Sequence, residues 1–239
     1  MTIFGTPGKI ISNRVHIFDP HEWGNSPATD YWADFGKDDL AAGGGRDLAA
    51  SGWEASGFSI LDGSGAEILD AANKGTTGGI NFDAVGDYII SPTMFGDWEH
   101  GVIAQQFLGY FPTKISFECG ARFVAGAGEN DTGFGFLQDG TDDNALVKAD
   151  LMAYITIDAT NFSLESSATA DACLTKTTTP HLFKVTATTG STFEWFVDGV
   201  SQGTLATVAA QAPMAWGAGT RAATGTNKPI ISWLHIWYE

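Results

Sequence analysis

The chain has 239 residues, of which 44% are hydrophobic and only 17% are charged. Its 28 acidic and 12 basic residues give a net charge of −16. The basic residues form no cluster, which argues against a phosphate backbone as partner because counterion release needs several cations on one face. The 30 glycines, 16 phenylalanines and 8 tryptophans indicate many turns and few long exposed helices. We therefore expect an all-β protein that binds no nucleic acid.

Residues 1–57 are expected to form an extended N-terminal arm. Much of this segment is rich in Asp, Gly and Ala and shows no sustained hydrophobic period. No stretch of the chain has the ~18 apolar residues of a membrane span, so no membrane partner is expected. Large aromatic residues are too frequent in the arm for disorder, and we expect them to anchor it on the protein body or on a neighbouring copy: Trp23, Tyr31, Trp32 and Trp53.

Candidate strands follow one another closely from about residue 78 onward, separated by Gly, Asp, Thr, Asn and Pro. They cover residues 79–91, 114–125, 132–138, 151–157, 161–166, 181–188, 192–197 and 229–238, and two short strands are expected before them at 58–61 and 67–69. Short strands at nearly even spacing are typical of a sandwich or barrel rather than of βαβ units. Residues 58–239 are therefore predicted to form one β-sandwich domain.

The strand at 114–125 alternates between an apolar and a polar face. The predicted core face holds Phe117, Cys119, Ala121 and Phe123, and the predicted solvent face holds Ser116, Glu118 and Arg122. Cys119 is thus expected to be a buried, unreactive thiol. The second cysteine, Cys173, lies in a stretch that reads as a loop, and the sequence leaves open whether the two approach each other.

A β-hairpin is predicted over residues 193–205. Phe193, Trp195 and Val197 alternate with other residues, and Asp198-Gly199 supplies the positive φ angles that a tight hairpin turn needs. Phe196 falls on the otherwise polar face of this strand, which is a hint that this face is covered.

The last strand, 229–238, is apolar on both faces. Regular alternation places Ile230, Leu234, Ile236 and Tyr238 on one face and Ile231, Trp233 and Trp237 on the other. We expect one face to be covered by the opposite sheet and the other by a further segment or subunit.

The sequence contains no residue pattern typical of catalysis. A glycosidase on a two-sheet fold needs a carboxylate pair on one strand face, whereas Glu67 and Asp70 are three residues apart and fall on opposite faces. There is no nucleophile elbow and no phosphate-binding loop. The acidic loop 139–144 offers oxygen ligands for Ca²⁺ but lacks the spacing of a calcium loop, and a solvated hairpin loop is favoured. We expect no catalytic residues and no cofactor, with Ca²⁺ as the alternative.

One series of motifs runs through residues 77–239: GINF (79–82), IISP (89–92), KISFECGARF (114–123), TGFGFLQDG (132–140), YITID (154–158), NFSLES (161–166), HLFKVTATTG (181–190), FEWFVDGVSQG (193–203) and IISWLHIWYE (230–239). The series resembles concanavalin A-like, or laminin G-like, jelly rolls. It is most similar to the domain of auxiliary structural proteins of tailed-bacteriophage heads. The resemblance implies a two-sheet antiparallel β-sandwich.

The resemblance also implies a function. It predicts a non-enzymatic capsid decoration protein on the exterior of the virion, made in the host cytoplasm, with the major capsid protein and other copies of itself as partners. Because buried aromatics dominate interface energies, the expected anchors are the four aromatics of the arm together with Trp233 and Trp237. The alternative is a lectin-like carbohydrate-binding module, in which exposed tryptophans hold a surface glycan.

Overall fold

The computed structural model describes residues 10–11, 14–15, 30–34, 59–61, 80–81, 88–90, 113–123, 132–138, 151–157, 160–167, 170–188, 192–206, 214–220 and 229–238. Within these residues the chain forms strands and turns and no helix. The predicted all-β class is therefore confirmed. The predicted strand at 67–69 and the acidic loop 139–144 lie outside the described residues.

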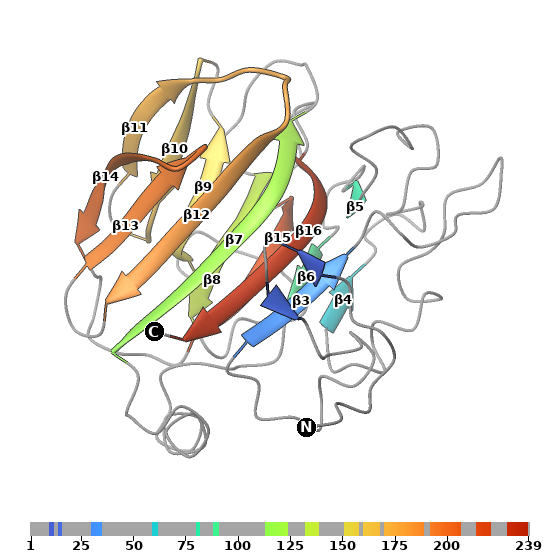
Figure 1. The fold of residues 1–239 in the computed structure, drawn as a ribbon. Helices are drawn as coiled ribbons and strands as arrows, with labels where there is room; N and C mark the ends of the chain where they lie inside the picture. Colours follow the sequence, from blue (N-terminus) through green and yellow to red (C-terminus); the bar gives the residue numbers. More distant parts are fainter. Residues whose placement is uncertain are drawn as a thin grey trace, which may run out of the picture.

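The strands form two antiparallel sheets that face each other (Figure 1). The front sheet has the order β14 (Val200–Ala206), β13 (Thr192–Val197), β12 (His181–Thr188), β7 (Lys114–Phe123), β16 (Pro229–Tyr238) and β3 (Asp30–Asp34), and β5 (Ile80–Asn81) also pairs with β16. The back sheet has the order β11 (Ala170–Thr175), β10 (Asn161–Glu165), β9 (Leu151–Ile157), β8 (Thr132–Gln138), β15 (Met214–Thr220), β6 (Tyr88–Ile90) and β4 (Ser59–Leu61). A small separate pair joins β1 (Ile10–Ile11) to β2 (Arg14–Val15).

Aromatic rings fill the space between the two sheets. Phe117 of the front sheet meets Phe136 of the back sheet edge to face, with ring centroids 5.0 Å apart and planes at 81°. Such edge-to-face pairs place the positive rim of one ring on the negative face of the other. Among the described residues of this core, the largest fully buried side chains are Trp195, Trp216, Phe117, Phe123, Phe134, Phe136 and Phe162.

Two local predictions are confirmed. In β7 the residues predicted to face the core, Cys119 among them, are all buried, and Glu118 and Arg122 of the predicted solvent face are half-exposed. Ser116, predicted to be on the same solvent face, is instead buried, and its hydroxyl shares a hydrogen bond with that of Thr186. In the hairpin β13–β14, Asp198 and Gly199 have φ angles of 52° and 78°. These angles are those of the mirror-image turn that matches strand twist, and Gly199 adopts its angle without strain because it has no Cβ.

The predicted faces of β16 are wrong at its start, where Ile231 was placed on the outer face. The pairing of β16 with β7 shifts by one residue between Ile231 and Trp233, which is the mark of a β-bulge at Ser232. Ile231 therefore joins Leu234 and Ile236 in the core cluster, whereas the regular alternation put it on the opposite face.

Five strands were not predicted: the two-residue strands β1 and β2, and the longer strands β3, β11 and β15. β11 contains Cys173, which is thus in a strand and not in a loop. β15 has the sequence MAWGAGT, whose glycines conceal its strand character. β3 lies within the segment predicted to be an extended arm, and its backbone pairs with the outer edge of β16.

The outer surface of the back sheet is buried. Tyr154 lies there and its hydroxyl donates hydrogen bonds to the carbonyl oxygens of Gly133, at 2.6 Å, and Gly219, at 3.2 Å. Tyr154 belongs to a second apolar cluster, whose members are Tyr88, Ile90, Leu137, Leu151, Tyr154 and Ala215. The front sheet differs, because most side chains on its outer surface are half-exposed, although Ser116 and His235 are buried there. This surface is where a binding site can lie.

Candidate functional site

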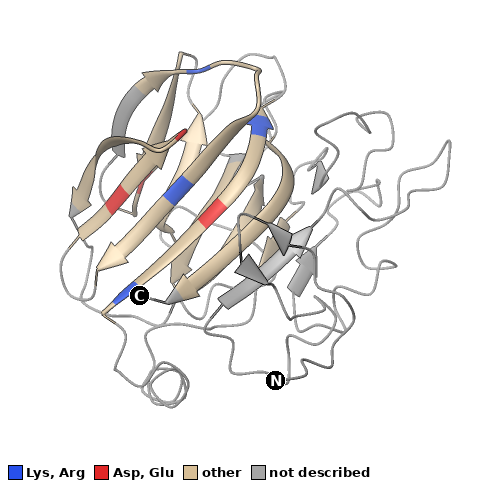
Figure 2. Ribbon diagram, viewed as in Figure 1, with Lys and Arg blue, Asp and Glu red and all other residues tan. Residues whose placement is uncertain are grey.

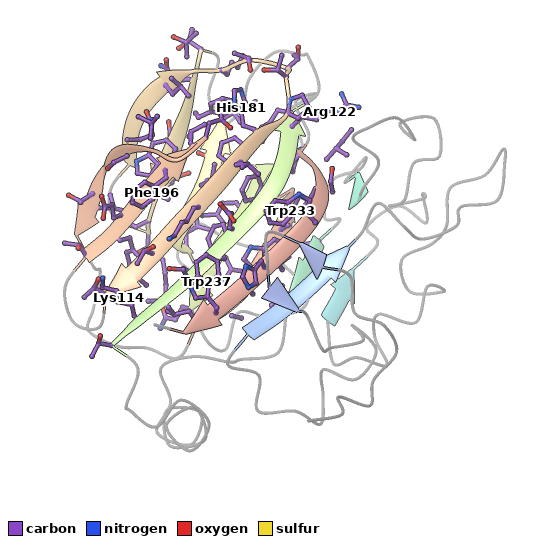
Figure 3. All side chains as sticks on the ribbon, in the orientation of Figure 1. Lys114, Arg122, His181, Phe196, Trp233 and Trp237 are labelled. Carbon is purple, nitrogen blue, oxygen red and sulfur yellow. The ribbon has the colours of Figure 1, made fainter. Side chains whose placement is uncertain are left out.

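The candidate site is the outer face of the front sheet, meaning the side chains of that sheet that point away from the core. Figure 3 shows these side chains toward the viewer, with Phe196, Trp233 and Trp237 labelled. The face is built from alternate residues of four neighbouring strands: Ser116, Glu118, Gly120 and Arg122 of β7, Leu182, Lys184 and Thr186 of β12, Glu194 and Phe196 of β13, and Trp233, His235 and Trp237 of β16.

Strand register arranges these residues in rows across the sheet. One row runs from His235 through Glu118 and Lys184 to Phe196, since each pairs with the next. Neighbouring strands are about 4.8 Å apart, so the ends of this row are separated by roughly 14 Å. That span exceeds a single sugar ring and suits an extended ligand.

Trp233 lies with its ring face over Gly120. A Cβ atom placed on Gly120 would meet Nε1 of the indole first, with Cε2 at 2.9 Å and Cδ1 at 3.0 Å. Because the two atoms bonded to Nε1 are nearly as close as Nε1 itself, the contact is through the face of the ring and not through its N–H edge. A glycine at this position lets the indole lie against the strand, and the second face of the ring is turned away from β7.

Lys184 lies between two aromatic rings. Its ammonium nitrogen is 5.0 Å from the ring centroid of Trp237 and 5.7 Å from that of Phe196. Trp237 also stacks on the buried ring of His235, with centroids 4.5 Å apart and planes at 23°. A cation over an aromatic face is stabilised by the ring quadrupole, so these contacts fix the position of the Lys184 side chain.

Polar groups surround the rings. The hydroxyls of Ser116 and Thr186 form a hydrogen bond of 2.8 Å, and the Ser201 hydroxyl donates to Glu194 at 3.0 Å. Glu118 lies at the register position between His235 and Lys184. Carboxylates accept hydrogen bonds and an ammonium donates them, so the face offers both kinds of group beside flat apolar rings.

A second polar cluster lies at the hairpin turn. Nδ1 of His181 is 2.7 Å from Oδ2 of Asp198, and Nε2 of His181 is 2.7 Å from the Thr177 hydroxyl and 3.2 Å from that of Thr179. The order hydroxyl, imidazole, carboxylate is that of hydrolase triads. Here, however, the hydroxyls of Thr177 and Thr179 share one ring nitrogen of His181 and also form a hydrogen bond with each other at 2.7 Å. This arrangement stabilises the loop and does not single out one hydroxyl as a nucleophile.

Asp198 ties the hairpin turn to the start of β12. Its Oδ1 accepts the Leu182 N–H at 2.9 Å, while its own N–H donates to the Leu182 carbonyl at 2.8 Å. Desolvation is the largest influence on the pKa of Asp198 and raises it, but the hydrogen bonds from Leu182 and His181 and the charge of His181 together hold that pKa below its usual value. Asp198 thus acts in turn formation, as its place in the sequence predicted.

The predicted anchors are only partly brought together. Trp233 and Trp237 both lie half-buried on the outer face. The backbones of Tyr31 and Trp32 pair with Ile236 and His235, but the side chains of β3 lie outside the described residues, as do Trp23 and Trp53 altogether.

Sequence reasoning missed Gly120 and Lys184. Gly120 occupies a solvent-face position in an otherwise regular strand, and a glycine within a strand is a sign of close approach by another group. Lys184 could not have been found, because its two aromatic neighbours come from strands that are distant in sequence. Phe196, flagged as an aromatic residue on a polar face, is confirmed as part of the outer face.

Metal and membrane sites were also sought. In the part of the chain that the structure describes, no group of three or more His, Cys, Asp or Glu side chains is placed to hold a metal ion. Among the same residues, no helix has the length and apolar character needed to cross a membrane. Ca²⁺ binding by residues 139–144 stays a prediction.

No protein-family model matches the chain, and no curated protein matches it in sequence. Solved structures do match. SO2946, a protein of unknown function from Shewanella oneidensis MR-1, has a TM-score of 0.52 at 13% identity, over 89% of this chain and 88% of that one. The carbohydrate recognition domain of Emp47p has a TM-score of 0.51 at 11% identity, over 88% of this chain and 95% of that one.

Two enzymes are also among the similar structures. A carbohydrate esterase of the Shiga toxin-encoding bacteriophage phi24B has a TM-score of 0.50 at 16% identity, over 80% of this chain and 94% of that one. This chain spans only about a quarter of the length of Trypanosoma rangeli sialidase, which it matches with a TM-score of 0.47. At these identities the similarity concerns the fold alone, so the expectation that the chain is not an enzyme stays a prediction.

The fold is therefore a two-sheet antiparallel β-sandwich of the jelly-roll type, as predicted.

Proposed function

We propose that this chain is a carbohydrate-binding domain and that the outer face of the front sheet holds the sugar. The observation that carries the proposal is the position of Trp233, which is half-exposed on the outer face and whose indole lies flat over Gly120. An indole presented in this way is a platform on which the C–H face of a pyranose ring can stack.

The groups around Trp233 suit the remainder of a sugar. Leu182, 43% exposed, lies at the register position beyond Gly120 and extends the flat apolar area. Glu118 and Lys184 in the next row can accept from and donate to sugar hydroxyls. The jelly-roll fold shared with the Emp47p carbohydrate recognition domain is compatible with this function. The proposal itself depends on the side chains of the outer face and not on that similarity.

Binding of the full chain to an array of glycans tests the proposal. A glycan that binds should then be titrated by calorimetry against the chain and against Trp233→Ala, for which we expect at least a tenfold loss of affinity because the stacking platform is removed. Val200→Ala is the matched control: Val200 is 62% exposed but belongs to the edge strand β14, and its loss should leave affinity unchanged. An array without signal, or equal affinity of the chain and Trp233→Ala, overturns the proposal.

Capsid decoration, the function that the sequence resemblance implied, is the second candidate. The observation in its favour is that Trp233 and Trp237 are large aromatic side chains left half-exposed on one face, as an anchor for a partner protein would be. Under this proposal the major capsid protein, or another copy of the chain, covers that face at the exterior of a virion. Sedimentation of the chain with capsid shells, and loss of sedimentation in Trp237→Ala, is the expected result; a chain that stays in the supernatant refutes it.

A further inference from the structure

Two tryptophans share the outer face of β16. Trp233 and Trp237 are both half-exposed, and Figure 3 shows them at separate places along the strand. The pairing of β16 with β7 runs from Trp233 to Trp237 without a register shift, so this stretch keeps the regular rise of a strand. A rise of about 3.3 Å per residue places the two positions roughly 13 Å apart. The outer face thus offers two separate aromatic contact points.

The surface between the two tryptophans is low. The residue that lies between them on the same face of β16 is His235, which is only 6% exposed. On the neighbouring strand β7, Gly120 pairs with Trp233 and has no side chain, and the half-exposed Glu118 pairs with His235. No exposed side chain of β16 therefore separates the two tryptophans, and a ligand can pass from one to the other along this strand.

The two contact points differ in chemistry. Trp233 lies flat over a glycine, whereas one face of Trp237 is stacked on His235 and the ammonium group of Lys184 is 5.0 Å from its ring centroid. Figure 2 shows an acidic residue in the middle of β7 beside a basic residue of β12, and these are the register partners Glu118 and Lys184. A sugar at Trp237 thus meets the remaining exposed part of the ring together with a hydrogen-bond donor.

We propose that the outer face binds a linear oligosaccharide longer than a disaccharide, which lies along β16 with one sugar on Trp233 and a later sugar at Trp237 and Lys184. This inference rests on the proposed function and names its ligand class. A monosaccharide or disaccharide does not reach from one tryptophan to the other, so it uses one contact point. In a longer chain the second contact becomes intramolecular, and the affinity rises well above that of either contact alone.

A size series tests this inference. The full chain is titrated by calorimetry with the disaccharide and with the hexasaccharide of one linear glycan that binds on the array. A hexasaccharide contains several overlapping disaccharides, which alone gives a severalfold gain at a single contact point. We expect the hexasaccharide to bind at least about thirtyfold more tightly than the disaccharide, because it reaches both points.

Two variants remove the second contact point. In Trp237→Ala the advantage of the hexasaccharide should fall to the severalfold gain, whereas the disaccharide should bind as before because Trp233 remains. Lys184→Met keeps an unbranched apolar side chain beside the rings and removes the ammonium group, so it should narrow the advantage severalfold. Val200→Ala on the edge strand is the matched control and should change neither affinity. Circular dichroism of each variant verifies the fold, and Lys184→Met carries the test if Trp237→Ala does not fold.

Each outcome decides one question. If the unmodified chain binds the hexasaccharide only severalfold more tightly than the disaccharide, the inference is overturned and carbohydrate binding at one contact point stands. An advantage of the hexasaccharide that survives undiminished in both Trp237→Ala and Lys184→Met also overturns it, since the second contact then lies elsewhere. Absence of binding for both ligands and for every array glycan refutes the proposed function itself.

Discussion

The contact between Gly120 and Trp233 gives the sharpest test of the site's construction. In Gly120→Ala the new methyl group would fall on the indole ring, with Cε2 at 2.9 Å and Cδ1 at 3.0 Å, closer than real Cβ contacts come. The ring has to move, and forcing an extra carbon into such a contact costs about 1–3 kcal/mol. Alanine in a strand is favoured over glycine by roughly 0.5–1 kcal/mol. The free energy of unfolding should therefore fall by about 1 kcal/mol.

The same substitution should change sign when the indole is absent. In a Trp233→Ala background the methyl group meets no ring, and only the gain of roughly 0.5–1 kcal/mol remains. The two substitutions are thus expected to be coupled by about 1–3 kcal/mol. A coupling of this size identifies the indole as the group that Gly120 accommodates.

Urea unfolding followed by circular dichroism measures this cycle, since fluorescence would change when Trp233 is removed. With a slope of about 2–3 kcal/mol per molar urea, 1 kcal/mol moves the midpoint by roughly 0.4 M, which is readily measured. The reasoning is refuted if Gly120→Ala lowers the midpoint equally in both backgrounds. In the intact background the variant should also lose glycan affinity, because the indole no longer lies flat.

Other substitutions test the turn, the back sheet and the core. Asp198→Asn should lower stability by at most about 1 kcal/mol, since the carboxylate is half-exposed. Because the pKa of Asp198 is lowered in the folded state, its contribution is present above the ordinary carboxyl pKa of about 3.9 and is lost as pH falls through the folded value. The urea midpoints of the chain and the variant should converge in acid, and a constant gap would contradict this. Gly135→Ala should cost about 3 kcal/mol or more in urea unfolding, because φ is +155° and the new Cβ would collide with the backbone oxygen of Ala153; a loss below 1 kcal/mol would contradict it. Tyr154→Phe removes a hydroxyl that serves two buried carbonyls and should cost about 1–3 kcal/mol by the same measurement; a neutral result would show that those carbonyls do not need it. Burial, and then the charge of a neighbouring glutamate, raises the pKa of Cys119 well above its usual value, so in a Cys173→Ser background a thiol reagent should label Cys119 only at the rate of unfolding; rapid labelling of that native variant would disprove its burial.

The sequence alone predicted the features that depend only on residues adjacent in the chain. The alternation of β7 predicted which residues face the core because a strand has a fixed period of two. The Asp198-Gly199 turn was predictable because few residue pairs adopt positive φ angles at both positions.

The remaining features depend on pairings between distant strands. β7 lies between β12 and β16, and no local pattern states that Lys184 and Trp237 belong to strands on either side of it. β15 escaped prediction because its glycines have low strand propensity, whereas in the sheet they leave room for neighbouring groups, as Gly217 does for Leu137. The phase of β16 was wrong at its start because a bulge is fixed by the partner strand and leaves no clear sign in the sequence.

The bulge at Ser232 has a consequence for the shape of any ligand. A bulge bends its strand and increases the local right-handed twist, and this one lies before both tryptophans of β16. From Trp233 to Trp237 the pairing with β7 continues without a further shift, so both rings stand on one regular stretch of strand, about 13 Å apart along it. A ligand that touches both rings would therefore run along β16, and the bend falls beyond Trp233, at the end of that path.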